Sequence, residues 1–157
     1  MKLLLYSDEY FYKQLNDFYS VYDENNEYIG SDFDRNYADI FHINNVKYIN
    51  YAINSLDGFR NVTHVIIQKT QFKNLQLMKV LFRIKHFNPN VKTILFMDDD
   101  PLYYEVLLSR IASNHLAYVV SNYQELDDLF RNDFNQDLSE YILKKETKKL
   151  LKEFRLY

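Results

Sequence analysis

The sequence predicts an α/β fold, and two observations lead to that prediction. Short apolar runs rich in β-branched residues alternate five times with longer segments whose apolar residues recur at helical spacing. The chain has 157 residues, of which 47% are apolar, and this suffices for one domain with a sizeable core. Strands that alternate with helices form right-handed crossovers and a parallel sheet covered on both faces. We therefore expect a five-stranded parallel sheet in the order 2-1-3-4-5, with helices on both faces and an extra helix at the C-terminus.

The expected strands are short runs without a helical period: Lys2–Tyr6, Tyr37–Ile43, Val62–Ile67, Val91–Met97 and Leu116–Val120. The expected helices carry an apolar face: Glu9–Tyr19, Val46–Leu56, Gln71–Phe87, Leu102–Ala112, Tyr123–Phe130 and Asp137–Phe154. Residues 22–35 are polar, so we expect a loop or a short hairpin there. We divide the chain into an α/β domain at residues 1–135 and a basic amphipathic helix at residues 136–157. That helix packs on the domain or on a dimer partner.

Acidic residues follow two of the expected strands, the first and the fourth. They are Asp8, Glu9, Asp98, Asp99 and Asp100. The carboxyl ends of parallel strands share one edge of a sheet, where ligands bind in open α/β folds. Carboxylates at that edge are candidate ligands for Mg²⁺, which binds oxygen atoms. In the alternative interpretation, Asp98–Asp100 only cap the following helix, and Asp8 pairs with Lys69 after the third strand.

The composition excludes several classes of site. Cysteine is absent, so there is no disulfide framework or thiolate site. Neither glycine lies in a strand-to-helix turn, so a dinucleotide fingerprint and a P-loop are excluded. The histidines lack metal-site spacing, and the serines lack the pattern of a nucleophile elbow. No apolar stretch approaches the roughly 20 residues of a membrane span. We expect a cytoplasmic protein with no membrane span and no cofactor.

The chain resembles the receiver domain of bacterial response regulators, best over residues 88–130, and residues 1–20 and 62–69 also fit that family. The segment NPNVKTILFMDDD and, after a helix, HLAYVVSNYQELDDLF follow the layout of that family from its fourth strand to its fifth helix. The resemblance implies an acidic pair after the first strand, at Ser7 and Asp8 or, with a shift of one residue, at Asp8 and Glu9. It also implies a phosphoacceptor aspartate, a Thr or Ser switch and a phosphate-pairing lysine, but the chain has other residues there. These are Gln68 followed by Lys69, Met97 or Asp98, and Ser121 or Asn122.

The resemblance implies a non-catalytic regulatory module that binds proteins and has lost aspartyl phosphorylation, because a carboxamide cannot form an acyl phosphate. Lys69 either takes the place of the cation or is a solvated loop residue. In the family, the surface from the fourth helix to the fifth helix binds partners. We expect a homodimer and a regulatory protein partner, and the candidate interface residues are Leu102, Tyr103, Val106, Leu107, Tyr118, Tyr123, Ile142, Leu150 and Phe154.

Two other functions remain open at this point. The acidic strand ends favour a Mg²⁺-dependent phosphoryl-transfer enzyme, although no nucleophile or phosphate cradle is recognisable. The terminal segment 138–157 carries six basic and three acidic residues, a net charge of +3 in a chain of net charge −3. A basic helix of this kind is also compatible with a nucleic-acid-binding accessory protein. Its interleaved glutamates instead favour a solvated face on a docked helix.

Overall fold

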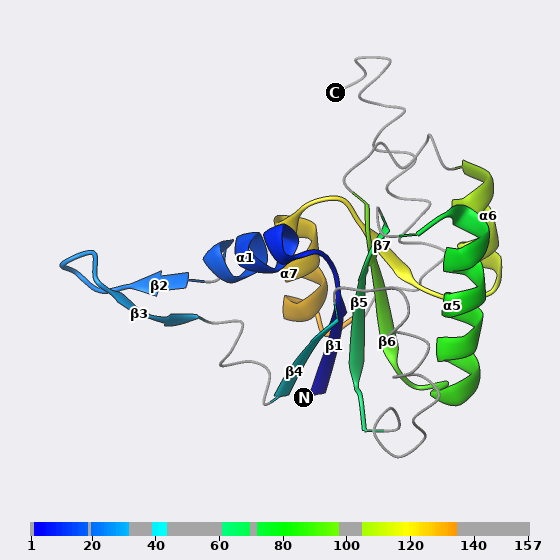
Figure 1. Cartoon of the computed structure of the whole chain (residues 1–157), viewed down its shortest axis with the longest axis horizontal. Helices are drawn as coiled ribbons and strands as arrows, with labels where there is room; N and C mark the ends of the chain where they lie inside the picture. The colour runs from blue at the N-terminus through cyan, green and yellow to red at the C-terminus, as the bar shows by residue number, and fades with distance from the viewer. Residues whose placement is uncertain are drawn as a thin grey trace.

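The computed structural model describes residues 2–18, 20–31, 39–43, 61–69, 72–97 and 105–134. These residues include a parallel sheet in the order β4-β1-β5-β6-β7 (Figure 1). Its strands are β1 (Lys2–Tyr6), β4 (Asp39–Ile43), β5 (His64–Gln68), β6 (Lys92–Phe96) and β7 (Tyr118–Val120). Strand β1 lies between β4 and β5 and pairs with both, and β6 pairs with β5 and β7. The predicted α/β class and parallel sheet are confirmed.

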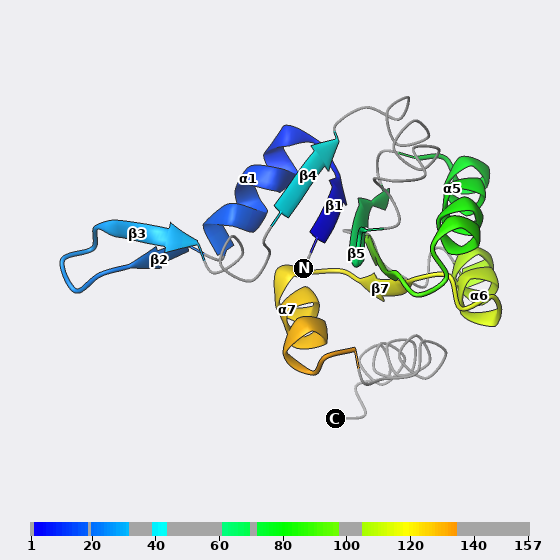
Figure 2. The same cartoon turned by 90° about the horizontal axis from the view of Figure 1, so that it is seen from below.

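Helices cover both faces of this sheet (Figures 1 and 2). One face packs against α5 (Asn74–Phe87) and α6 (Glu105–Ser113), and the other packs against α1 (Glu9–Phe18) and α7 (Tyr123–Arg131). Because both faces are covered, all five residues of β5 are buried, and β6 is buried from Thr93 onward. This explains why these strands have continuous apolar runs instead of alternating patterns.

The core consists of one apolar cluster on each face. Ile67, Leu81 and Leu95 are fully buried in the cluster beneath α5 and α6. Ile66 and Ile94 belong to the cluster beneath α1 and α7. Neighbouring residues of one strand thus face opposite layers. Each fully buried side chain of this size contributes about 1.5–3 kcal/mol, so the two clusters are the main source of stability.

A β-hairpin lies between α1 and β4. It consists of β2 (Ser20–Tyr22) and β3 (Tyr28–Ser31), which pair antiparallel, and it projects from the end of α1 away from the parallel sheet (Figures 1 and 2). Its turn is fixed by Asp23, whose Oδ1 accepts hydrogen bonds of 2.9 Å from the N–H groups of Asn25 and Glu27. Of the two predicted alternatives for this segment, a loop or a short hairpin, the hairpin is the one observed.

Several predicted features fall outside the described residues. They are the helix 46–56, the acidic run 98–100, Leu102, Tyr103 and the terminal helix with Ile142, Leu150 and Phe154. In the part of the chain that the structure does describe, no helix has the length and apolar character needed to cross a membrane.

Candidate functional site

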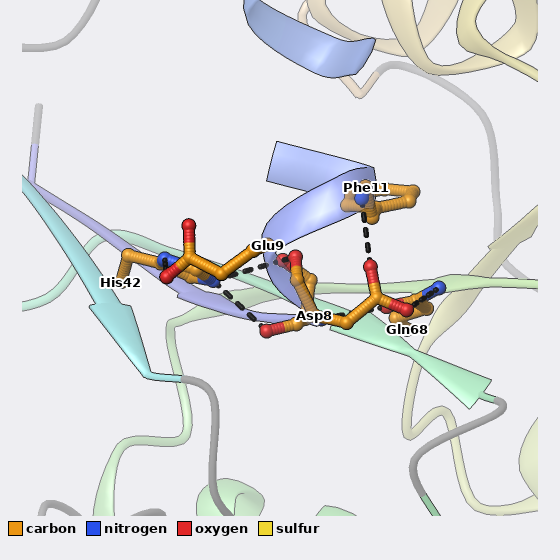
Figure 3. Close-up of polar contacts among 6 residues, drawn as sticks. Asp8, Glu9, Phe11, His42 and Gln68 are labelled. Atoms are coloured by element: carbon orange, nitrogen blue, oxygen red, sulfur yellow. Dashed lines mark hydrogen bonds and ion pairs between the residues drawn. The ribbon is translucent and has the colours of Figure 1, made fainter. Parts of the chain in front are cut away.

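The carboxyl ends of β1 and β5 are joined by a pair of hydrogen bonds between Asp8 and Gln68 (Figure 3). The Asp8 backbone N–H donates to Gln68 Oε1 at 2.9 Å, and Gln68 Nε2 donates to Asp8 Oδ2 at 3.4 Å. The other carboxylate oxygen of Asp8 accepts the Phe11 N–H at 2.7 Å, so Asp8 also caps the N-terminus of α1. Strand order brings these residues together although 60 positions separate them in sequence.

Lys69 follows Gln68 and is buried, with 8% of its surface exposed. Its ammonium donates to the carbonyl oxygen of Phe72 at 3.1 Å, and the Phe72 N–H donates back to the Lys69 carbonyl at 3.0 Å. These bonds fix the turn that leads from β5 toward α5. Of the two interpretations of Lys69, the solvated loop residue is wrong, because a buried ammonium that is bonded to a carbonyl is a structural part of this edge.

A second polar group lies where β1 and β4 end, around His42 (Figure 3). His42 Nε2 lies 2.9 Å from the Ser7 carbonyl oxygen and 3.1 Å from Ser7 Oγ. Its Nδ1 lies 3.9 Å from Glu9 Oε1. The Tyr12 ring stacks on the imidazole with a centroid distance of 4.5 Å and an interplanar angle of 7°. The ring is therefore held on one face by Tyr12 and at Nε2 by Ser7, while the Glu9 carboxylate lies near Nδ1.

Ser7, His42 and Glu9 have the residue types of a hydrolase triad, but their hydrogen bonds assign them another role. A carbonyl oxygen only accepts, so His42 Nε2 carries the proton that the Ser7 carbonyl accepts. The same nitrogen cannot then remove the proton of Ser7 Oγ, which donates to the Asp8 carbonyl at 3.0 Å. Ser7 is also fully buried, so no substrate reaches its hydroxyl. The arrangement fixes β4 against the start of α1.

The ends of β6 and β7 complete this edge of the sheet. Met97 is buried, and its N–H donates to the Val120 carbonyl at 2.8 Å. Ser121 binds the carboxylate of Glu125 through its N–H at 2.9 Å and through its hydroxyl at 3.2 Å. Asn122 Oδ1 accepts the Glu125 N–H at 2.8 Å, so Asn122 and Glu125 form a capping arrangement at the start of α7.

The structure describes two of the five predicted metal ligands, Asp8 and Glu9. Asp8 accepts the amide protons of Phe11 and Gln68, while the Glu9 carboxylate lies toward His42, two-thirds exposed. Within the described ranges, no group of three His, Asp or Glu side chains is arranged to hold a metal ion. The prediction that involves Asp98–Asp100 lies outside those ranges.

The described part of the predicted interface lies on α6, β7 and α7. Val106 is 70% exposed, while Tyr118 and Tyr123 are half-buried. Tyr118 reaches the carbonyl oxygen of Phe134 with its hydroxyl, at 3.4 Å. Leu107 lies on the inner side of α6, so it packs in the core and is not part of a surface. The two described positions on α6 therefore divide by helical phase into a surface residue, Val106, and a core residue, Leu107.

Sequence reasoning did not find the role of His42. In sequence it is one of four scattered histidines, and Ser7 lies 35 positions away. The only available signal was its place near the end of an expected strand that neighbours the first strand in the predicted order.

The chain is similar to known proteins in its fold. No protein-family model matches the chain, and no curated protein matches it. Among solved structures, it is similar to a pilus assembly-related protein from Burkholderia pseudomallei, with a TM-score of 0.56 and 14% identity over 84% of this chain and 87% of that chain. A CheY-like response regulator receiver domain protein from Methanospirillum hungatei gives a TM-score of 0.48 and 13% identity over 94% of this chain and 97% of that chain. At such low identity, the Burkholderia likeness supports the α/β fold of this chain and nothing more specific.

Proposed function

We propose that this chain is a receiver-like regulatory module that binds proteins without aspartyl phosphorylation and without catalysis. The observation that carries the proposal is the pair of hydrogen bonds between Gln68 and Asp8 at the carboxyl edge of the sheet. In the receiver family that the sequence resembles, the position of Gln68 belongs to the aspartate that accepts the phosphoryl group.

The chemistry at this position supports the proposal. An acyl phosphate forms when an anionic carboxylate oxygen attacks phosphorus, and a carboxamide has no such oxygen. Both polar atoms of the Gln68 side chain are also engaged with Asp8. The site is therefore filled by its own hydrogen bonds, in an arrangement that needs no bound group to complete it.

The residue after β7 supports the same conclusion. Receivers pair the phosphoryl group with a lysine there, whereas this chain has Ser121. The Ser121 hydroxyl and N–H both bind the Glu125 carboxylate. Glu125 would repel an incoming dianion rather than bind it. Both the acceptor and the cation of the phosphorylation switch are thus replaced by neutral side chains.

A module of this kind acts by being bound, and the surface of α6, β7 and α7 is the candidate interface. Val106 gives it an exposed aliphatic side chain, and Tyr118 and Tyr123 are aromatic residues of a type enriched at interfaces. Symmetric dimers are the commonest closed oligomers. The proposed assembly is a homodimer that uses this surface or the terminal helix, and a regulatory protein is the further partner.

The test is exposure to acetyl phosphate or beryllofluoride with Mg²⁺, followed by NMR. We expect the amide shifts of Asp8, Gln68 and Ser121 to stay unchanged. A phosphorylatable receiver in the same buffer is the positive control. A covalent phosphate on any aspartate, detected by mass spectrometry, would overturn the proposal.

A separate prediction concerns divalent ions at the same edge. We expect this edge to bind divalent ions weakly if at all. Millimolar Mg²⁺ should then leave the melting temperature unchanged, because a ligand stabilises a protein only when its concentration exceeds its dissociation constant. The measurement is a thermal shift of the wild type beside Asp98→Asn and Asp8→Asn. A rise in the wild type that disappears in either variant would instead favour the phosphoryl-transfer enzyme.

A further inference from the structure

Helix α5 differs in charge from the rest of the chain. Its sequence NLQLMKVLFRIKHF contains two lysines, one arginine and one histidine and no acidic residue, whereas the chain as a whole has a net charge of −3. The helix lies on the outside of the sheet beside α6 (Figures 1 and 2). The helix is therefore positively charged in a chain whose net charge is negative.

The same helix carries two large apolar side chains that are not buried. Leu75 is 68% exposed and Phe82 is 47% exposed. They are seven residues apart, and Lys79 and Arg83 follow Leu75 by four and eight residues, so all four lie on one face of the helix. The inward residues Leu77, Leu81 and Ile84 are in the core. The outward apolar residues are thus additional to those that hold α5 on the sheet.

This face is hollowed. A cavity of about 350 Å³ is lined, among the described residues, by Gln76, Lys79, Val80, Phe82 and Arg83. Its walls are largely apolar, and Lys79 and Arg83 are the charged residues among those that line it. A volume of this size accommodates one or two large apolar side chains. An aromatic anchor in a pocket with a polar rim is the usual form of an interaction hot spot.

We propose that this face of α5 (Leu75, Gln76, Lys79, Phe82 and Arg83) docks an acidic amphipathic segment of a partner protein. An apolar side chain of the segment fills the cavity against Phe82, and carboxylates one turn away face Lys79 and Arg83. The proposal rests on the proposed function as a protein-binding module, and it adds a second surface and the chemistry of its partner.

Charge decides among the possible occupants. The terminal segment 138–157 of this chain or of a second copy has a net charge of +3 and would be repelled by α5. Nucleic acid would satisfy the cations but not Leu75 or Phe82, which would lie exposed beside phosphates. An acidic segment with apolar residues at helical spacing matches both the charge and the apolar surface, as in other helix-in-groove complexes.

The experiment selects partners without assuming one. A phage-displayed library of random peptides about 16 residues long, enough for four helical turns, is selected on the full chain. A Lys79→Glu/Phe82→Ala variant is used for counter-selection. We expect the enriched peptides to be acidic and to have apolar residues at i, i+4 and i+7. Enriched peptides that are neutral or basic, or an absence of enrichment, would contradict the proposal.

The affinity of a selected peptide then tests the named residues by fluorescence anisotropy. We expect Lys79→Glu and Phe82→Ala each to weaken binding about tenfold, with circular dichroism confirming an intact fold. Lys92→Glu is the matched control, because it makes the same charge change at an exposed lysine outside this face, and we expect it to change affinity less than about twofold. Equal losses in Lys79→Glu and Lys92→Glu would show a general charge effect and overturn the proposal.

Two further outcomes are decisive. Tighter binding of an unrelated DNA oligonucleotide than of the selected peptide at this face would assign the surface to nucleic acid and overturn the proposal. Failure at α5 leaves the proposed function intact, because the phosphorylation test and the Val106 surface do not involve α5. A covalent aspartyl phosphate would instead remove the proposed function while leaving peptide binding at α5 measurable.

Discussion

The hydrogen bond between the side chains of Asp8 and Gln68 requires that one of the two is neutral. Gln68 Nε2 lies 3.4 Å from Asp8 Oδ2, a distance that suits a donor and an acceptor. Replacement of the amide nitrogen by a second carboxylate oxygen places two like charges at that distance, and neither is fully solvated. This residue therefore holds the sheet edge together only as a carboxamide.

We expect Gln68→Glu to destabilise the chain by about 1–3 kcal/mol at pH 7, the cost of an unpaired buried polar group. Part of the loss should return at acidic pH, because protonation of either carboxyl removes the repulsion between them. Urea denaturation at both pH values measures this. Gln76→Glu on the exposed face of α5 is the isosteric control, and an equal loss there would contradict the assignment.

His64 is the other residue whose protonation affects stability. It is buried between β5 and α7, where Phe130 and Phe134 lie 5.4 Å and 5.3 Å from its ring. Burial lowers the pKa of His64 to about 4, and the positive charge of Lys92 adds to this effect. Thr63 Oγ1 lies 2.8 Å from its Nδ1, a hydrogen bond that suits the neutral ring.

The direction of the pH effect follows from these pKa values. Between about pH 6.5 and pH 4 the unfolded chain binds a proton that the folded chain does not, so stability falls as the pH is lowered. We expect a loss on the order of 1–3 kcal/mol over this window, measured by urea denaturation. His64→Phe should flatten the slope between pH 6.5 and pH 5, whereas the exposed His86→Gln should keep it.

At the scale of elements, the C-terminus of α6 contains a local strain. His115 follows the helix with a φ of 51°, in the left-handed region that favours glycine. The turn is closed by the Leu116 N–H, which donates to the Ile111 carbonyl at 3.1 Å, and by the Asn114 N–H, which donates to the Arg110 carbonyl at 3.2 Å. The connection into β7 therefore depends on a backbone shape that histidine adopts at a cost.

We expect His115→Gly to stabilise the chain by about 1 kcal/mol, because glycine adopts this conformation without a Cβ clash. The preceding residue gives the control: Asn114→Gly, outside the positive-φ region, should be neutral or destabilising. Chemical denaturation of both variants is the measurement. A destabilised His115→Gly would show that the imidazole makes a contact worth more than the strain.

For the molecule as a whole, the layer formed by α5 and α6 carries exposed apolar side chains. The α5 face combines cations with apolar residues, while α6 adds Val106 beside them in the same layer. At the carboxyl edge of the sheet, the described residues Asp8, Gln68, Ser121 and Glu125 bind one another in pairs. Among the described residues, the outer side of α5 and α6 is therefore the surface on which we expect a partner to bind.

The proposed homodimer can be tested at Val106. We expect Val106→Arg to leave the melting temperature unchanged, because the side chain is 70% exposed, and to lower the dimer fraction by burying a charge at the interface. Light scattering across a concentration range measures the mass. Loss of the dimer on truncation after Asn135, with Val106→Arg unaffected, would place the interface on the terminal helix instead.

The sequence alone determined the α/β class and most strand positions, because burial on both faces produces apolar runs that need no partner to be recognised. The predicted strand 91–97 corresponds to β6 (Lys92–Phe96), and the predicted strand 62–67 corresponds to β5 (His64–Gln68). Each predicted boundary lies within two residues of the observed one. Helix α7 begins at Tyr123 as predicted, since Asn122 is a cap that the local sequence encodes. Local sequence patterns were enough to place these three elements.

Tertiary structure alone decided the contacts at the sheet edge. Asp8 meets Gln68 across 60 positions and Ser7 meets His42 across 35, because β1 lies between β4 and β5 and all three strands end at one edge. No local pattern encodes that adjacency. The exposure of Phe82 was likewise decided by packing. Leu81 and Phe82 are adjacent apolar residues of one expected helix, and the orientation of α5 on the sheet buries the first and exposes the second.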